Sequence, residues 1–218
     1  MNSQRLPSLQ FELPLWHSGL MHVAGLDEAG RGAWAGPVTA AVVVLPPNDP
    51  DICQKLHAVR DSKLMSARER ANWFTIIKQE VLYWAIGLAD NQEIDRLNIL
   101  RATRLAMTRA LEQLPVAPQH LLIDALILRE LDLPQTALVK GDQLSLSIAA
   151  ASVLAKHVRD CWMKETDLLH PGYGFARHKG YGTAVHRQAI TSLGPCSIHR
   201  FSYKPLISFS QPAQQTFD

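Results

Sequence analysis

The organisation of the chain is set by the stretch His22-Val23-Ala24-Gly25-Leu26-Asp27-Glu28-Ala29-Gly30-Arg31-Gly32. Its first part, through Asp27, is a short apolar run that ends in an acid, as a buried strand would. The Gly30-Arg31-Gly32 segment is a turn signal. A Val- and Ala-rich run from Pro37 to Leu45 follows and indicates a second buried strand. The stretch therefore predicts two strands on either side of a tight turn, with carboxylates where the first strand ends.

Helical and extended segments alternate through the rest of the chain. Ser66, with Glu69 three residues later, forms a capping box that starts a helix running through Val81. Further helices are predicted at residues 94–114, 144–168 and 183–193, and further strands at 83–89, 120–123 and 137–139. We expect residues 1–20 to be an irregular extension, residues 21–205 to form the main domain with a short helical C-terminal segment, and residues 206–218 to be a loose tail. The order predicts a mixed α/β sheet with helices packed on its faces.

The composition is that of an ordinary soluble protein and disfavours a membrane-spanning class. The 218 residues are 47% hydrophobic and 19% charged, which suits one domain with a full core. No apolar run reaches the roughly 18 residues that a spanning helix needs, and the N-terminus lacks the order of a secretory signal. The cysteines Cys53, Cys161 and Cys196 form neither a disulfide framework nor a zinc motif. A reducing compartment, the cytoplasm, is the simplest expectation.

Charge is distributed unevenly along the chain, although the net charge is only +2. From Lys140 onward there are nine Lys or Arg against five Asp or Glu, while the residues before it carry a slight acidic excess. Such a division suits a protein that holds cations in one place and a polyanion in another. Chance asymmetry is the simpler explanation when charge is considered alone.

Four carboxylates stand at or near the ends of predicted strands. They are Asp27 and Glu28 after the first strand, Asp124 after the strand at 120–123, and Asp142 after the strand at 137–139. Acids at the ends of neighbouring strands converge at one sheet edge, where like charges repel unless protons or cations intervene. Oxygen-only clusters suit Mg²⁺ or Mn²⁺, and two such ions are a known device for phosphodiester hydrolysis. The alternative, that these acids are turn formers or helix caps, stays open on spacing alone.

The glycine-rich loop matches a nucleotide-binding motif only in part. Gly25 and Gly30 have the gap of a P-loop, but Arg31 and Gly32 stand where its Lys and Ser/Thr are required. A Gly-Arg-Gly turn beside carboxylates has another use, because residues without Cβ let the backbone approach a sugar or phosphate closely. Arg31 can hold a phosphate through a bidentate fork. The alternatives are a plain tight turn and a small-molecule NTPase, which the missing P-loop residues disfavour.

Further motifs accompany this loop in a fixed order and extend the pattern over residues 22 to 204. They are Ala35-Gly36-Pro37-Val38, Asp61-Ser62-Lys63, Glu93 to Leu100, Leu122-Ile123-Asp124, Lys140-Gly141-Asp142, Ser147 to Ser152, Ala155-Lys156, His178-Lys179-Gly180-Tyr181-Gly182-Thr183 and His199-Arg200. With the loop, this set resembles ribonuclease HII, the type 2 ribonuclease H family. The chain departs from the family pattern in two places: the pair Ala33-Trp34 stands where Pro-Leu is frequent, and Ala125 stands where a glycine is common.

The resemblance implies a ribonuclease H-like fold, a five-stranded mixed β-sheet flanked by helices. It implies an endonuclease that hydrolyses the RNA strand of RNA–DNA hybrids and cuts 5′ of ribonucleotides embedded in duplex DNA, leaving a 3′-hydroxyl and a 5′-phosphate, in replication and ribonucleotide excision repair. By the same comparison, the catalytic and metal-binding positions, for two Mg²⁺ or Mn²⁺ ions during catalysis, are Asp27, Glu28, Asp124 and Asp142. The substrate-binding positions are Gly30, Arg31, Gly32, Lys63, Lys179 and Tyr181. We expect a monomer with no membrane partner.

A competing interpretation is a non-catalytic protein that binds RNA–DNA hybrids and kept the fold. The intact set of four acids argues against it, because binding alone has no need of clustered negative charge facing a phosphate. Among single residues, His178 and His186 are expected to be exposed or to face phosphate, and His199 to have either a structural or a phosphate-binding role. No His/Cys grouping has zinc spacing.

Overall fold

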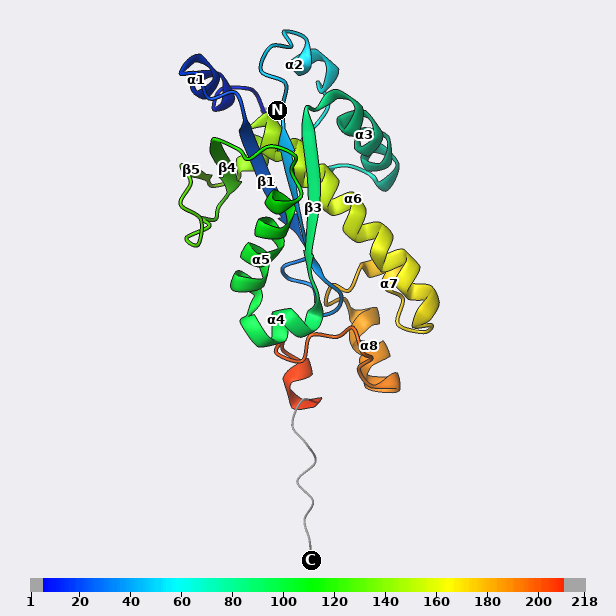
Figure 1. The fold of residues 1–218 in the computed structure, drawn as a ribbon. Coiled ribbons are helices and arrows are strands. Elements are labelled where there is room, and N and C mark those ends of the chain that lie inside the picture. The colour runs from blue at the N-terminus through cyan, green and yellow to red at the C-terminus, as the bar shows by residue number, and fades with distance from the viewer. Residues whose placement is uncertain (1–5, 210–218) are drawn as a thin grey trace, which may run out of the picture.

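A five-stranded sheet forms the centre of the computed structural model, which describes residues 6–209 (Figure 1). The strand order is β3-β2-β1-β4-β5. The strands are β1 (Val23–Ala29), β2 (Val38–Val44), β3 (Tyr83–Ala89), β4 (His120–Asp124) and β5 (Gln135–Leu138). β2 is antiparallel to both β1 and β3, whereas β4 runs parallel to β1 and β5 runs parallel to β4. The expected five-stranded mixed sheet is confirmed.

Helices cover both faces of the sheet (Figure 1). α6 (Leu146–Leu169) packs along β1 and β2 on one face together with α3 (Ala67–Glu80), and α5 (Ile99–Glu112) packs on β2 and β3 on the other. This explains the continuous apolar run of β2, because a strand covered on both faces has no exposed side that would favour polar residues. α3 begins at the predicted capping box of Ser66 and Glu69.

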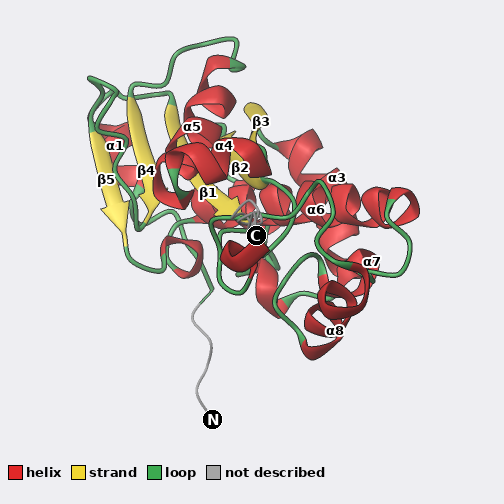
Figure 2. Ribbon diagram, turned by 90° about the horizontal axis from the view of Figure 1, so that it is seen from below, coloured by secondary structure: helices red, strands yellow, loops and turns green. Residues whose placement is uncertain are grey.

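The remaining helical segments are short. They are α1 (Glu12–His17), α2 (Ile52–Lys55), α4 (Asn91–Leu97), α7 (Phe175–His178) and α8 (Ala184–Leu193), with 3-10 turns at Ser62–Leu64, Gly141–Gln143 and Leu206–Phe209. Figure 2 shows α7 and α8 grouped near α6, on the side of the molecule away from β5. Across residues 6–209, no helix has both the length and the apolar character that crossing a bilayer requires.

The expectation of one helix at residues 94–114 is wrong, because α4 and α5 stand there and meet at Asn98. The backbone φ of Asn98 is +67°, which a right-handed helix cannot continue through. Its side-chain Oδ1 accepts from the N–H groups of Leu100 and Arg101, at 3.0 and 3.2 Å. Asn98 therefore ends one helix and caps the next. The apolar spacing runs across this break, which is why periodicity alone does not reveal it.

Both ends of the described chain have more structure than expected. Within the extension expected to be irregular, Glu12–His17 forms α1, and Glu12 and Trp16 are buried. Within the tail expected to be loose, Leu206–Phe209 forms a 3-10 turn in which Leu206 is buried. The two expectations are therefore wrong for these segments. They also included residues 1–5 and 210–218, which lie outside the described residues.

Candidate active site

Asp27 and Asp124 are brought side by side by the parallel pairing of β1 with β4. Leu26 pairs with Ile123 in that register, so the two acids occupy the next position on each strand. Glu28 follows on β1, and Asp142 lies in the 3-10 turn after β5. The backbone N–H of Gly141, the residue before Asp142, donates to Asp124 Oδ1 at 2.8 Å. This hydrogen bond connects the turn to the end of β4. The structure thus gathers all four acids at one edge of the sheet.

Asp27 and Asp142 are buried, and neighbouring charges raise the pKa of both. Burial raises the pKa of Asp27 well above its usual range, and the charges of Glu28 and Asp124 raise it further. Burial also raises the pKa of Glu28. The pKa of Asp142 is raised to about 6, by burial first and then by the charges of Asp61 and Asp124. A cation among these carboxylates would relieve the repulsion that raises the pKa values of Asp27 and Asp142.

The donor atoms fit a hard divalent cation. All four side chains offer carboxylate oxygens, the ligands that Mg²⁺ and Mn²⁺ prefer. Glu28 Oε2 is buried without a hydrogen-bond partner among the described residues, a costly state for a carboxylate oxygen that a cation would remove. Within residues 6–209, no group of three or more His, Cys, Asp or Glu side chains is drawn tightly enough to hold a metal ion as it stands. Two of the acids instead accept backbone N–H groups, Asp27 from Glu28 and Asp124 from Gly141.

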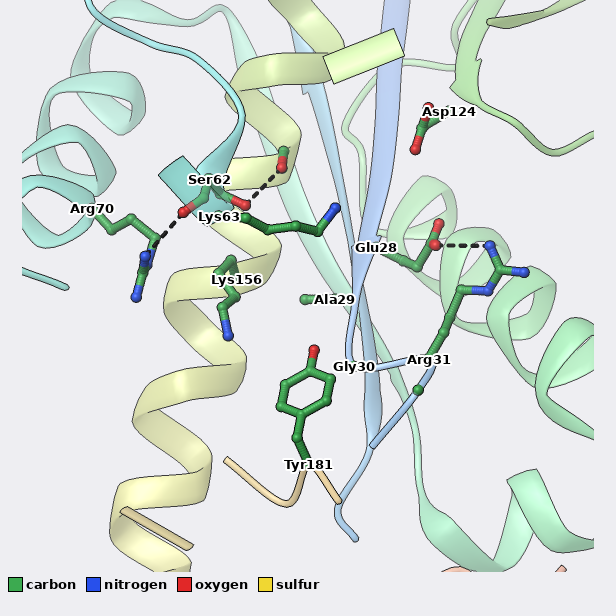
Figure 3. A pocket seen from close by; sticks show the side chains of 12 residues that line it. Glu28, Ala29, Gly30, Arg31, Ser62, Lys63, Arg70, Asp124, Lys156 and Tyr181 are labelled. Carbon is green, nitrogen blue, oxygen red and sulfur yellow. Dashed lines mark hydrogen bonds and ion pairs between the residues drawn. The ribbon is translucent and has the colours of Figure 1, made fainter. Parts of the chain in front are cut away.

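A cavity of about 770 Å³ opens beside the acids (Figure 3). In Figure 3, Glu28 and Asp124 lie on one side of it and Lys63 and Lys156 on the other, while the hydroxyl of Tyr181 points between them. The cavity is lined by Glu28, Ala29, Gly30, Arg31, Gly32, Ser62, Lys63, Arg70, Asp124, Ser152, Lys156 and Tyr181. Asp27 and Asp142 are buried and are not part of this lining. Acids facing cations across one cavity suit a phosphodiester backbone that passes over a metal centre.

The Gly-Arg-Gly loop forms one end of the cavity and packs against two buried arginines, Arg159 and Arg200. Gly30 has a φ of +95°, and a Cβ on it would lie 1.9 Å from Arg159 Nε. The carbonyl of Arg31 accepts from Arg200 Nη1 at 3.0 Å. The Arg31 guanidinium turns toward Glu28, with Nη1 and Oε1 3.2 Å apart (Figure 3). The loop backbone is therefore held in place, while the partly exposed Arg31 side chain can exchange its partner.

We expect Gly30→Ala to lower the free energy of unfolding by about 1–3 kcal/mol and Gly32→Ala to change it by less than about 0.5 kcal/mol. A Cβ on Gly30 clashes with Arg159 on a left-handed backbone, whereas a Cβ on Gly32 meets nothing within 4 Å. Urea unfolding of the matched pair measures the difference. Equal losses of stability would contradict the close packing of Gly30 on Arg159.

Of the other residues expected to bind substrate, Tyr181 and Lys63 line the cavity and Lys179 does not. The ring of Tyr181 has Lys156 Nζ 5.5 Å from its centroid. Burial acts to lower the pKa of Lys63, but the surrounding carboxylates, Asp61 first among them, raise it overall. Lys179 Nζ instead donates to the backbone carbonyl of Ala176.

The cavity also contains side chains that the sequence interpretation did not assign to substrate binding. Ser152 and Lys156 lie one turn apart on α6, and Arg70 of α3 lines the same cavity. Ser152 Oγ is 2.8 Å from Ser62 Oγ, and Asp160 pairs with Lys156 at 2.6 Å and with Arg70 at 3.1 Å. The four-residue spacing from Ser152 to Lys156 is a usable sequence signal, because it places both on one helix face. Arg70 has no comparable signal.

Two buried histidines, His186 and His199, form a hydrogen-bonded chain that ends at the Tyr181 carbonyl. The expectation that His178 and His186 are exposed or face phosphate is wrong, since both are buried, as is His199. The N–H of Cys196 donates to His199 Nδ1 at 2.8 Å, so His199 carries its proton on Nε2, which lies 3.0 Å from His186 Nε2. His186 Nδ1 in turn donates to the Tyr181 carbonyl at 3.0 Å. These neutral imidazoles support the Tyr181 backbone, which settles the role of His199 as structural.

We expect this histidine chain to destabilise the fold as the pH falls from about 6.5 toward 4. Burial lowers the pKa of His186 and His199 to about 4, so in this interval the unfolded chain binds protons that the folded protein does not. The stabilisation is therefore present above the unfolded pKa and is lost on acidification. In His199→Asn, whose amide oxygen can still accept from Cys196, one of these groups is gone and the fall in Tm between pH 7 and pH 5 should be smaller.

Thermal unfolding of this variant beside the wild type separates the histidines from the acids. Asp27, Glu28 and Asp142 have raised pKa values and therefore act in the opposite sense, because they favour the folded state on acidification. That contribution is common to both proteins and cancels in the comparison. The same fall in Tm for both would show that folding does not lower the pKa of His199.

Acids gathered at one edge of such a sheet, beside a cationic cavity, place the protein among metal-dependent nucleases of ribonuclease H topology. A family model described as Ribonuclease HII matches residues 24–206. The chain belongs to the ribonuclease HII family. It is accordingly a metal-dependent endoribonuclease that hydrolyses the RNA strand of RNA–DNA hybrids.

Curated relatives named Ribonuclease HII match most of the chain. The protein of Synechococcus sp. (strain JA-3-3Ab) is 53% identical over 201 residues, which are 92% of this chain and 89% of that protein. The protein of Anaeromyxobacter sp. (strain Fw109-5) is 50% identical over 198 residues, which are 91% of this chain. The match covers only 61% of that longer protein.

Solved structures share the fold at lower sequence identity. The ribonuclease H2 from Pyrococcus horikoshii OT3 has a TM-score of 0.70 at 24% identity, covering 86% of this chain and 96% of that chain. Bst-RNase HIII in complex with Mn²⁺ has a TM-score of 0.60 at 18% identity, covering 86% of this chain and 68% of that chain. At these identities the likeness is one of fold.

Proposed function

We propose that the enzyme also cuts on the 5′ side of single ribonucleotides embedded in duplex DNA, leaving 3′-hydroxyl and 5′-phosphate ends. RNA differs from DNA in its backbone only by the 2′-hydroxyl, so a lone ribonucleotide must be recognised at that group. The observation that carries the proposal is that the Gly-Arg-Gly loop and Tyr181 line the same cavity as Glu28 and Asp124. A loop without Cβ atoms at Gly30 and Gly32 can approach a sugar whose phosphate lies at the acids.

In this proposal Asp27, Glu28, Asp124 and Asp142 hold Mg²⁺ or Mn²⁺, with two ions during catalysis. Divalent ions bound in this way supply an activated water and stabilise the leaving oxygen in phosphodiester hydrolysis. Glu28 Oε2, which has no hydrogen-bond partner among the described residues, and the raised pKa values of Asp27 and Asp142 support the role of the acids as ligands. The Mn²⁺ complex of Bst-RNase HIII, a protein of the same fold, supports Mn²⁺ as one of the ions.

Different residues of the chain then bind different parts of the substrate. Gly30 and Gly32 bring the backbone to the ribose, and Arg31 leaves Glu28 for a phosphate. Tyr181 offers a ring on which the sugar beside the RNA–DNA junction packs, a contact that is indifferent to sequence. Phosphates are met by the cations of the opposite wall, which are Lys63, Arg70 and Lys156. Lys179, which is not part of this lining, is proposed to contact a phosphate as well.

Cleavage of three labelled duplexes of one sequence tests this proposal. They are an RNA–DNA hybrid, a DNA duplex with one ribonucleotide, and an all-DNA duplex. With Mg²⁺ or Mn²⁺, the first two should be cut and the third should not, and EDTA should abolish both cuts. Cleavage of the hybrid without cleavage at the single ribonucleotide would contradict the proposed recognition of a single 2′-hydroxyl group. Binding without any cut would favour the alternative, a non-catalytic hybrid-binding protein.

We further propose that the protein works as a monomer in the cytoplasm, in DNA replication and ribonucleotide excision repair, with residues 21–205 as its catalytic domain. The three cysteines, which are free in the structure, suit a reducing compartment. The cavity and all four acids come from one chain, so the site needs no second copy for its lining. Light scattering at micromolar concentration tests the monomer, and a stable dimer would contradict it.

A further inference from the structure

Glu12, in the N-terminal segment outside the family motifs, is a fully buried carboxylate at the start of α6. Its Oε1 accepts from Ser145 Oγ at 2.6 Å and from the Ser147 hydroxyl and backbone N–H at 2.7 and 3.0 Å. Its Oε2 has no hydrogen-bond partner among the described residues. A carboxylate is favourable at this place, because the N-terminus of a 24-residue helix offers unpaired N–H groups and the positive end of its dipole.

The same N-terminal segment also pairs with the backbone just before α6. The N–H of Ser8 donates to the Leu144 carbonyl at 3.1 Å, and the N–H of Leu146 donates to the Ser8 carbonyl at 3.0 Å. Gln10 Nε2 donates to the Leu144 carbonyl as well, at 3.2 Å. Residues 8 to 12 therefore hold residues 144 to 147 from both the backbone and the side chains.

The segment that is held in this way is continuous with the turn that carries Asp142. Ser145 N donates to the Gly141 carbonyl at 2.8 Å, so the start of α6 and the turn form one unit. That unit lies directly on β1, because a Cβ on Gly25, two residues before Asp27, would stand 2.4 Å from Ser147 Oγ. A shift of the first turn of α6 would thus move Asp142 relative to Asp27 and Asp124.

We propose that Glu12 is a positioning residue for the metal centre: by fixing residues 144 to 147, it sets the place of Asp142 among the acids. The inference rests on the proposed role of the four acids as metal ligands. Glu12 is not part of the lining of the cavity. Its effect is transmitted by the three hydrogen bonds to Oε1 and by the bond between Ser145 and Gly141.

Mn²⁺ binding by the substrate-free protein, measured by isothermal titration calorimetry, tests this role without using cleavage. Glu12→Ala should bind Mn²⁺ about tenfold more weakly, the low end of what loss of a group that orients metal ligands costs. Glu12→Gln keeps a carbonyl oxygen that can accept the same three bonds and should bind Mn²⁺ nearly as the wild type does. Met107→Ala, a core deletion in α5 on the opposite face of the sheet, is the stability control.

The outcomes separate positioning from general stability and from the proposed function. Met107→Ala should lower Tm while leaving the Mn²⁺ affinity unchanged. Wild-type affinity in Glu12→Ala, or an equal loss in Met107→Ala, would overturn the inference. If Glu12→Ala does not fold, Ser147→Ala removes one of the three bonds and should weaken Mn²⁺ binding about threefold, and unchanged affinity there would overturn the inference too. No Mn²⁺ binding by the wild type would instead overturn the proposed metal centre.

Discussion

Asp27→Asn is expected to lower cleavage on the order of 1000-fold while the affinity for an RNA–DNA hybrid is retained. Asp27 lies next to Glu28 on β1 and beside Asp124 at the end of β4, so its charge would act directly on a cation held there. Loss of metal-based charge stabilisation costs several kcal/mol of the barrier, and each 1.4 kcal/mol is a factor of ten. Asparagine keeps the shape of the side chain, so the substrate cavity should be unchanged.

A second measurement on Asp27→Asn distinguishes a catalytic acid from a structural one. Because burial and neighbouring charges raise the pKa of Asp27, the ionised side chain destabilises the metal-free fold at neutral pH. The variant should therefore have a higher Tm than the wild type in EDTA, and a smaller gain in Tm when Mn²⁺ is added. Asp132→Asn, at an exposed site in a loop, should change neither cleavage nor Tm and serves as the control. Normal turnover by Asp27→Asn would remove Asp27 from the metal centre.

Tyr181→Ala is expected to reduce cleavage at a single ribonucleotide by about 10- to 100-fold, the size of a lost stacking contact of 1–3 kcal/mol. The ring lines the cavity at the end opposite Asp124, with Lys156 Nζ and Arg159 Cζ each 5.5 Å from its centroid (Figure 3). Tyr181→Phe keeps the ring and should retain most activity. The backbone contacts of residue 181 with His186 should survive in both variants.

Comparing the loss of cleavage with the loss of duplex affinity in the Tyr181 variants shows what the ring contributes. If the ring packs on the sugar beside the junction, kcat/KM for the single-ribonucleotide duplex should fall much more than the affinity for a duplex of the same length. Equal losses in both would show that Tyr181 contributes only general duplex binding. A loss in Tyr181→Phe as large as in Tyr181→Ala would shift the role from the ring to the hydroxyl.

The sheet and its acids were accessible from sequence because each depends on short-range patterns. The apolar run into Asp27, the Gly-Arg-Gly turn and the all-apolar β2 are local signals, and acids at strand ends were expected to meet at one sheet edge. At Ala125 the structure also agrees with the family pattern seen in the sequence. Its φ of +51° lies in the left-handed region, which explains why a glycine is common at this place in the family pattern.

The features that the sequence did not reveal depend on contacts between distant residues. Glu12 and Ser147 are 135 positions apart, and nothing in the polar spacing around Glu12 indicates that it is buried. The histidine chain joins His186 to His199 and Cys196, and its burial reflects the packing of α7 and α8 rather than any local period. Single histidines in polar surroundings read as exposed for this reason.

The Arg70 side of the cavity was hidden in the same way. Arg70 lies on the first turn of α3, and its guanidinium is held by the Ser62 carbonyl at 2.9 Å and by Asp160 of α6 at 3.1 Å. A helix–helix contact of this kind is set by how α3 docks on α6, which residue spacing within either helix does not specify. The acidic wall of the site could therefore be predicted, and most of the cationic wall could not.

Mapping the cut made in a DNA duplex that carries one ribonucleotide, with Mn²⁺ present, tests the proposed reaction most directly. A single cut on the 5′ side of the ribonucleotide is predicted, with a 3′-hydroxyl on the upstream DNA and a 5′-phosphate on the ribonucleotide. These ends follow from attack by a water on the phosphorus with the 3′-oxygen leaving. A cut on the 3′ side, or a 2′,3′-cyclic phosphate formed by the ribose hydroxyl itself, would contradict the account.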